Sequence, residues 1–300
     1  MKHSEGSFRG ASELELYYQC WRPAEHPRAV IAIVPGLGDH SGRYTNVCGY
    51  FLPRGYAIYA FDTRGNGRSP GQRGYVSEWG EFREDLGSFL AFIHDREPRT
   101  PVFLLGESLG AVMALEYCLR RPQALSGVIC AAPPLGEVGI SPFLWMVAHL
   151  LNRVWPRFSV TTGLDNSNLS RDPERGKEFE RDPLTHNRGT ARLAIELRRA
   201  VEWIHAHAAD LRLPLLILHG TADRIASSQG SRDFIGKVRF LDSELRKYEG
   251  GYHEPYADIN KGEVLAYTEQ WLERHLDRVK RSVASAPNVP SPRGERESRR

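Results

Sequence analysis

Short runs of almost uninterrupted hydrophobic residues constrain the fold of this chain most strongly. Five such runs lie at residues 29–34, 56–61, 102–105, 127–131 and 213–218. Strands that are buried on both faces of a parallel sheet have this pattern. Between the runs, amphipathic segments such as 79–93 carry apolar side chains at spacings of three and four, as on one face of a helix. The alternation predicts an α/β protein with a mostly parallel central sheet and helices on both faces.

The alternation of strand and helix patterns stops between residues 133 and 207. This stretch contains an apolar, aromatic segment at 142–155, a polar loop from Asp165 and a second helical pattern at 193–201. No long strand pattern is present in it, so we expect a mainly helical insertion. The segment 142–155 fits either a core helix of the insertion or a surface that contacts an acyl chain or a lipid interface.

The chain is therefore expected to consist of three parts. They are a core at 10–134 and 208–280, a helical cap insertion at 135–207, and a disordered tail at 281–300. Ser, Pro and Arg dominate the tail without any periodicity. Its five Arg and two Glu account for the formal net charge of +3 of the whole chain.

Composition excludes several classes of protein. A chain of 300 residues with 41% hydrophobic and 26% charged residues is neither largely disordered nor fibrous. Outside the tail, acidic and basic residues balance, which gives no basis for a nucleic-acid groove. No apolar run approaches the ~18 residues that a membrane span requires, and the first residues lack the apolar segment of a secretory signal. We expect a cytoplasmic protein, peripheral to a membrane at most, without an obligate protein partner.

The four cysteines indicate a reducing compartment. They lie at positions 20, 48, 118 and 130 without any C-x-x-C spacing. In a chain of this length, that distribution predicts neither a disulfide framework nor a zinc site. His205, His207 and Asp210 have a spacing similar to that of metal ligands, but positions i and i+2 of a helix do not share a face. We therefore expect no metal site.

The strongest local signal is the segment Gly106-Glu-Ser108-Leu-Gly110, a G-x-S-x-G sequence. It follows the hydrophobic run 102–105 and precedes a helical pattern. The motif requires this context, because a sharp turn between strand and helix exposes the serine hydroxyl. Ser108 is thus the predicted nucleophile. Glu107 could take part in catalysis, but we expect it to face away along the turn.

A serine hydroxyl needs a base to become a useful nucleophile. In this type of fold, the acid and then the histidine follow the serine along the chain. Asp223 lies just after the strand pattern 213–218, and His253 lies in a glycine-rich loop after another short strand pattern. Either residue alone fits a turn or a surface position equally well. Their order and their positions at strand ends together predict a Ser108, His253 and Asp223 triad.

An oxyanion hole requires two backbone N–H donors aimed at the developing charge. The N–H of Leu109, directly after the nucleophile, is one candidate. The other is the N–H of Leu37 in the sequence Pro35-Gly-Leu-Gly38, which follows the strand pattern 29–34. Gly65 to Gly71 form a second glycine-rich segment, but it lacks both a G-x-G-x-x-G spacing and a Walker lysine, so we interpret it as a turn rather than a phosphate site.

Taken together, these segments resemble the monoacylglycerol lipases and lysophospholipases of the serine α/β-hydrolase superfamily. The resemblance extends from about residue 10 to residue 278. Its motifs are PGLGDHSGRY (35–44), FDTRGNGRSPGQRG (61–74), GESLG (106–110), RDPLTHN (181–187), LHGTADRI (218–225) and YEGGYHEPYAD (248–258). Two positions depart from the family pattern, with Pro35 where histidine is usual and Ala111 where glycine is usual.

The resemblance implies an α/β-hydrolase fold with a cap over the site, and it implies neither a cofactor nor a metal. It implies a carboxylic ester hydrolase that acts on a monoacylglycerol or a lysophospholipid, a small lipid ester, through an acyl-enzyme. Transient contact of the cap with a membrane surface would fit such a substrate. Three alternatives remain: an esterase or peptidase for small substrates with the same triad, a non-catalytic binding protein of the same fold, and an epoxide hydrolase or haloalkane dehalogenase. Ser108 argues against the last pair, because they use an aspartate nucleophile.

Overall fold

The five hydrophobic runs form neighbouring strands in the middle of one sheet. The computed structural model describes residues 2–121, 125–136 and 142–284. Its eight-stranded sheet has the order β1-β2-β4-β3-β5-β6-β9-β10. The strands are β1 (Lys2–Arg9), β2 (Glu15–Arg22), β3 (Ala29–Val34), β4 (Tyr56–Phe61), β5 (Val102–Glu107), β6 (Gly127–Ala131), β9 (Leu215–Gly220) and β10 (Ser243–Tyr248). From β4 to β10 all pairs are parallel, whereas β2 pairs antiparallel with both β1 and β4. The predicted α/β protein with a mostly parallel central sheet is confirmed.

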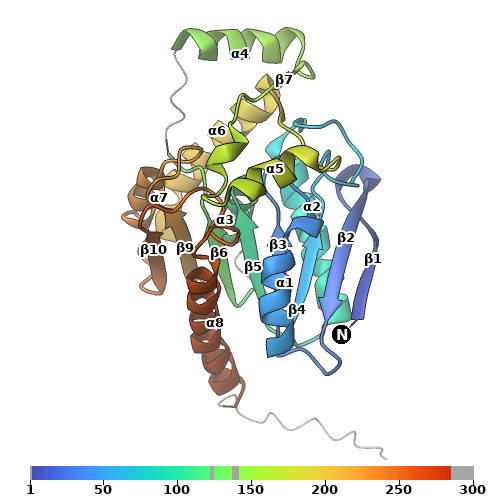
Figure 1. The fold of residues 1–300 in the computed structure, drawn as a ribbon, viewed down its shortest axis with the longest axis vertical. Coiled ribbons are helices and arrows are strands. Elements are labelled where there is room, and N and C mark those ends of the chain that lie inside the picture. The colour runs from blue at the N-terminus through green and yellow to red at the C-terminus, as the bar shows by residue number, and fades with distance from the viewer. Residues whose placement is uncertain (1, 122–124, 137–141, 285–300) are drawn as a thin grey trace, which may run out of the picture.

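Helices cover both faces of the sheet (Figure 1). Those of the core are α1 (Thr45–Phe51), α2 (Trp79–Arg96), α3 (Leu109–Arg120), α7 (Ser228–Ile235) and α8 (Lys261–Ala284). The strands alternate between two separate cores, as their period of two requires. On β3, Val30 and Ala32 pack into the core that includes α2 and α3, while Ile31 and Ile33 pack into the core that includes α1 and α8. The helices thus hold the sheet rigidly from both sides.

The segment between β6 and β9 lies over one end of the sheet (Figure 1). Its elements are α4 (Pro142–Val154), β7 (Ser159–Thr161), α5 (Pro173–Arg181), β8 (Arg188–Thr190) and α6 (Ala191–Ala206). The helices dominate, as the sequence predicts. The antiparallel pair β7 and β8 was not expected, because three residues are too few to show a strand pattern.

Two further elements differ from the sequence prediction. Strand β1 has no hydrophobic run because most of its side chains are exposed at the edge of the sheet. Helix α8 continues to Ala284, into the range 281–300 that was predicted to be a disordered tail. The residues of the helix that follow Leu276 contain no Gly or Pro, and Arg278, Lys280, Arg281 and Ala284 are good helix formers, so the helical conformation can continue. The rest of the predicted tail, 285–300, lies outside the described residues.

Candidate active site

The turn between β5 and α3 presents Ser108 at the end of the sheet. Its backbone φ of 51° lies in the region that non-glycine residues rarely adopt. A side chain on Gly106 would come within 2.4 Å of the Gly110 oxygen, and one on Gly110 within 2.1 Å of the Val34 oxygen. The two glycines of the motif therefore make the strained turn possible.

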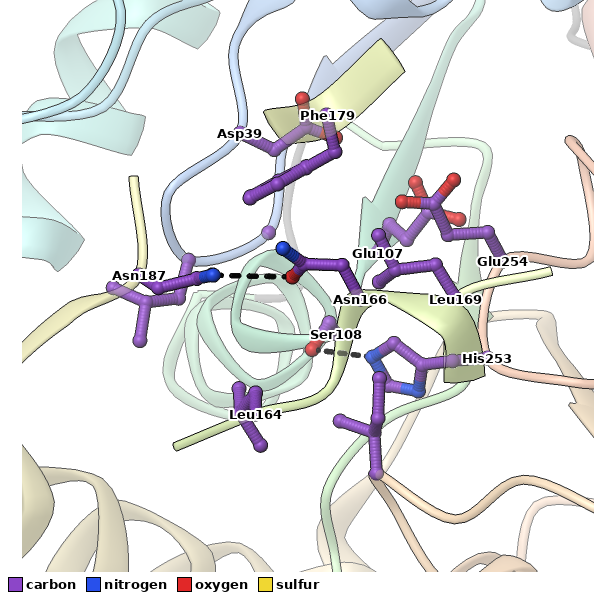
Figure 2. Close-up of a pocket in the computed structure, with 13 residues that line it drawn as sticks. Asp39, Glu107, Ser108, Leu164, Asn166, Leu169, Phe179, Asn187, His253 and Glu254 are labelled. Carbon is purple, nitrogen blue, oxygen red and sulfur yellow. Dashed lines mark hydrogen bonds between the residues drawn. The ribbon is translucent and has the colours of Figure 1, made fainter. Parts of the chain in front are cut away.

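The structure brings the three predicted side chains into one line. The Nε2 atom of His253 lies 2.9 Å from Ser108 Oγ, and its Nδ1 atom lies 2.8 Å from Asp223 Oδ2. Figure 2 shows the serine hydroxyl and the imidazole facing each other. Because Nδ1 faces a carboxylate, it carries the proton, and Nε2 is free to accept the hydroxyl proton of Ser108. This geometry is that of a nucleophile, a base and an orienting acid.

The loop after β9 fixes the carboxylate of Asp223. Its Oδ1 atom accepts hydrogen bonds from the N–H groups of Ile225 and Ala226 at 2.8 and 2.9 Å. Burial alone would raise the pKa of Asp223, but hydrogen bonds from His219 and His253 and the backbone lower it well below its usual range. Asp223 is therefore ionised at neutral pH.

The surroundings of His253 favour its charged form. Burial would lower the pKa of His253, but the hydrogen bond and charge of Asp223, with a smaller contribution from the charge of Glu254, raise it above its usual value. An imidazolium that forms when Ser108 loses its proton is thus stabilised in place.

The loop after β3 approaches the nucleophile closely. A side chain on Gly36 would lie 3.3 Å from Ser108 Cβ, so the loop backbone comes near the serine. Gly38 has a φ of 74°, and a side chain there would meet the His186 oxygen at 1.8 Å. Leu37 lies between these two glycines and lines the pocket next to Ser108. Leu109 is the first residue of α3, so its N–H has no partner within the helix.

Hydrogen bonds from two distant segments hold this loop. The N–H of Gly38 donates to Asn66 Oδ1 at 2.9 Å, and the N–H of His186 donates to the Gly38 carbonyl at 3.0 Å. Asn66 belongs to the glycine-rich segment that was interpreted as a turn, and it is a turn, but its bracing role was not predicted. These bonds position the loop that begins at Pro35.

A small pocket of about 60 Å³ opens beside Ser108 (Figure 2). One group of lining residues is apolar, namely Leu37, Leu164, Leu169, Phe179 and Ile225. The other is polar, namely Asp39, Glu107, Asn166, Asn187 and Glu254. Asn187 donates a hydrogen bond to Asn166 at 3.2 Å. The site therefore offers both apolar and polar surface to a ligand next to the nucleophile.

Glu107 does not face away from the site, in contrast to the sequence expectation. It lines the pocket and accepts a hydrogen bond from the Tyr44 hydroxyl at 2.9 Å. Burial, and then the charges of Glu254 and Asp39, raise the pKa of Glu107 to about 8. The side chain of Glu107 therefore carries a proton at neutral pH. Its orientation into the pocket depends on contacts with residues distant in the sequence, which no local sequence pattern shows.

Two arginines compensate the other two acidic side chains. Arg43 pairs with Asp39 at 2.9 Å, and Arg175 of α5 pairs with Glu254. All four are largely buried. The Arg175 pair connects the loop of His253 with the segment over the site, and Arg43 also lies 3.9 Å from Glu254, which connects the loop after β3 with the loop of His253. With three acids and two arginines, one buried acid is left without a cation, which agrees with a protonated Glu107.

The histidines considered as metal ligands have structural contacts instead. His205 Nε2 lies 2.8 Å from the Leu135 carbonyl, and the His207 ring stacks on Trp203. Within the part of the chain that the structure describes, no group of three or more His, Cys, Asp or Glu side chains could hold a metal ion.

The four cysteines are buried and unpaired. In the described segments, no helix combines the length and the apolar character needed to cross a bilayer.

Comparison with known proteins agrees with this geometry. The family described as serine aminopeptidase, S33 (Hydrolase_4) matches residues 25–260. The chain belongs to this family. As a member of the S33 family whose G-x-S-x-G serine lies between β5 and α3, it is a serine hydrolase. The predicted α/β-hydrolase fold and the predicted resemblance to monoacylglycerol lipases are confirmed.

Individual S33 relatives are similar over nearly their whole length. A protein of Mycolicibacterium smegmatis named monoacylglycerol lipase is 34% identical, over 91% of this chain and 98% of its own. The monoglyceride lipase of Rattus norvegicus is 30% identical, over 92% and 90%. The crystal structure of the Paleococcus ferrophilus monoacylglycerol lipase has a TM-score of 0.80 at 32% identity, covering 87% of this chain and all of that one.

Proposed function

We propose that this S33 hydrolase cleaves the acyl ester of a monoacylglycerol. The observation that carries the proposal is the relay from Ser108 through His253 to Asp223, in a chain similar along its length to proteins named monoacylglycerol lipase. The pocket supports a substrate with both an apolar acyl group and a polar, hydroxyl-bearing head group, because both kinds of side chain line it. A lysophospholipid has the same two parts and is the alternative substrate.

The proposed reaction begins with proton transfer from Ser108 Oγ to His253 Nε2. The oxygen attacks the ester carbonyl, and the N–H groups of Leu37 and Leu109 stabilise the oxyanion. Asp223 orients the imidazole and stabilises its cation. When the tetrahedral intermediate collapses, His253 returns the proton to the departing glycerol oxygen. Water, deprotonated by the same imidazole, then releases the fatty acid from Ser108.

We propose that residues 135–207 are the cap of this enzyme, between core segments 10–134 and 208–280. Leu164, Asn166 and Phe179 of this segment line the pocket, which supports a role in substrate binding. The exposed apolar side chains of α4 support transient contact with a membrane surface. The unpaired cysteines support a cytoplasmic location, peripheral to that membrane.

The proposed substrate is tested by comparing kcat/KM across a panel of esters. The panel contains monoacylglycerols of several chain lengths, di- and triacylglycerol, lysophosphatidylcholine, p-nitrophenyl acetate and an amino-acid p-nitroanilide. We expect the highest kcat/KM for a long-chain monoacylglycerol, because its acyl group can contact the apolar lining and its glycerol hydroxyls the polar lining. Ser108→Ala is the matched control and should lose at least about 10³-fold of the activity.

Three outcomes would contradict the proposal. A sharp optimum at acetate would indicate a small-ester esterase, and faster cleavage of the anilide would indicate a peptidase. Failure of the wild-type protein to react with a fluorophosphonate probe would indicate a non-catalytic binding protein. A preference for lysophosphatidylcholine would instead assign the enzyme to the alternative substrate, a lysophospholipid, whose head group is glycerophosphocholine.

A further inference from the structure

A second buried histidine contacts the carboxylate of Asp223. His219 lies on β9, four residues before Asp223, and its side chain is fully buried. Its Nε2 atom lies 2.9 Å from the Ala226 carbonyl oxygen and 3.2 Å from Asp223 Oδ2. Its Nδ1 atom lies 2.8 Å from the Ser231 hydroxyl on α7. The proposed reaction gives this histidine no role.

The contacts of His219 determine which nitrogen carries its proton. Nε2 faces two acceptors, a carbonyl and a carboxylate, so it must be the N–H donor. Nδ1 then accepts from the hydroxyl of Ser231. Oδ2 of Asp223 accepts the hydrogen bond from His253 and also lies 3.2 Å from Nε2 of His219, whose N–H is shared with the Ala226 carbonyl.

We propose that His219 is a positioning residue of the relay, which donates a hydrogen bond to the same oxygen of Asp223 that orients His253. Oδ1 is held by two backbone N–H groups, and His219 holds Oδ2, so the carboxylate is fixed at both oxygens. The second donor also makes Oδ2 less basic, which moderates its attraction for the protonated imidazole of His253. This inference rests on the proposed function of the relay.

A purely structural role must be separated from this one. The ring of His219 also connects β9 to α7 through Ser231, and a space-filling role would depend on that contact equally. Two amide side chains separate the alternatives, because the amide nitrogen of Gln lies where Nε2 of histidine does, whereas that of Asn lies near Nδ1. His219→Gln can still donate to Asp223. His219→Asn can still contact Ser231 but not Asp223.

The experiment measures kcat/KM against pH for p-nitrophenyl butyrate with His219→Asn, His219→Gln and Ser231→Ala. The acid limb reports the ionisation of His253 in the free enzyme. In His219→Asn, Oδ2 has lost a donor, so we expect the limb to move to higher pH by about half a unit or more, with a several-fold lower kcat. His219→Gln should keep the wild-type limb and most of kcat. Ser231→Ala should keep the limb even if its melting temperature falls.

The proposal would be overturned if the acid limb of His219→Asn lay at the same pH as that of the wild type. It would also be overturned if His219→Gln or Ser231→Ala shifted the acid limb as much as His219→Asn does. Glu107 and Glu254, the other acids that act on His253, are the same in all variants. A measurement on the unaltered protein covers the case that a variant does not fold. Nitrogen-15 NMR of labelled histidine should show His219 protonated at Nε2, and protonation at Nδ1 alone would contradict the inference. Ester hydrolysis by the wild-type protein tests the relay itself. A failure of the proposed relay can therefore be distinguished from a failure of the proposed role of His219.

Discussion

Glu107 lies directly beside the nucleophile and yet is not part of the relay. Its carboxyl is enclosed with Glu254 and Asp39, and the only hydrogen bond that we find to it comes from Tyr44 within the described part of the chain. Burying the ionised form of such a carboxyl group costs more free energy than burying the protonated form. The protein therefore holds a proton on Glu107 across the neutral range, at the edge of the substrate pocket.

This proton makes the stability of the protein depend on pH. The pKa of Glu107 is raised from an ordinary 4.5 to about 8 by folding. Between these values the unfolded chain releases a proton that the folded protein retains, so the free energy of unfolding falls as pH rises. One such group contributes at most about 1.4 kcal/mol per pH unit. Glu107→Gln has no proton to release, so its stability relative to wild type should increase from pH 5 to pH 8.

Urea unfolding at pH 5, 6.5 and 8 measures this difference. Glu25→Gln, the same replacement at an exposed position, is the control and should show little pH dependence relative to wild type. A difference between Glu107→Gln and wild type that stays constant over this range would show that Glu107 is ionised throughout.

At this scale, the sequence predicts the residues that carry local signals. Ser108 has its glycine motif, and Asp223 and His253 follow strand patterns in the expected order. Asn66, Glu107 and His219 were missed or misplaced because their roles arise from tertiary contacts. Asn66 braces a loop 28 residues away, for example, and nothing near it in the sequence indicates that contact.

Helix α4 illustrates the element scale, because its two sides have different environments. Phe143, Met146, Leu150 and Val154 lie at spacings of three and four and are all more than 60% exposed. On another side, Trp145 lies under the Arg198 guanidinium of α6. The sequence left open whether this segment is a core helix or a lipid-contacting surface. The exposure of these four side chains excludes a core position for them.

Replacing two of these side chains should weaken binding to lipid vesicles. Met146→Gln with Leu150→Gln removes apolar surface that would enter the lipid interface, worth about 1.5–3 kcal/mol for each fully buried side chain. We expect vesicle co-sedimentation to fall at least about fivefold, while hydrolysis of soluble p-nitrophenyl butyrate is unchanged. Leu241→Gln, at a fully exposed leucine outside α4, is the control. Equal loss in the control, or no loss in the double variant, would refute membrane contact through α4.

Among the elements, the central strands were predictable because burial on both faces produces uninterrupted hydrophobic runs. β1 could not be predicted, since its mostly polar residues gain order from pairing with β2 along the sheet edge. The short strands β7 and β8 likewise depend on each other across 26 intervening residues, from 162 to 187. Tertiary pairing, rather than local propensity, determines these strands.

At the scale of the whole molecule, the site exists only because distant segments converge. The relay comes from the turn after β5, the loop after β9 and the loop of His253. The loop after β3 approaches the serine. The segment over the site is hydrogen-bonded to two of these loops. The N–H of His186 donates to the Gly38 carbonyl, and the N–H of Glu254 donates to the Leu169 carbonyl at 2.8 Å. The segment that covers the pocket therefore also helps to position the groups beneath it.

The covalent intermediate tests this account most directly. Wild-type protein and Ser108→Ala are mixed with p-nitrophenyl octanoate, quenched in acid within the first turnovers, and analysed by intact mass and peptide mapping. The account predicts an octanoyl group on Ser108, formed with a burst of nitrophenol and absent from the variant. An acyl group on another residue, or undiminished turnover by Ser108→Ala, would contradict it.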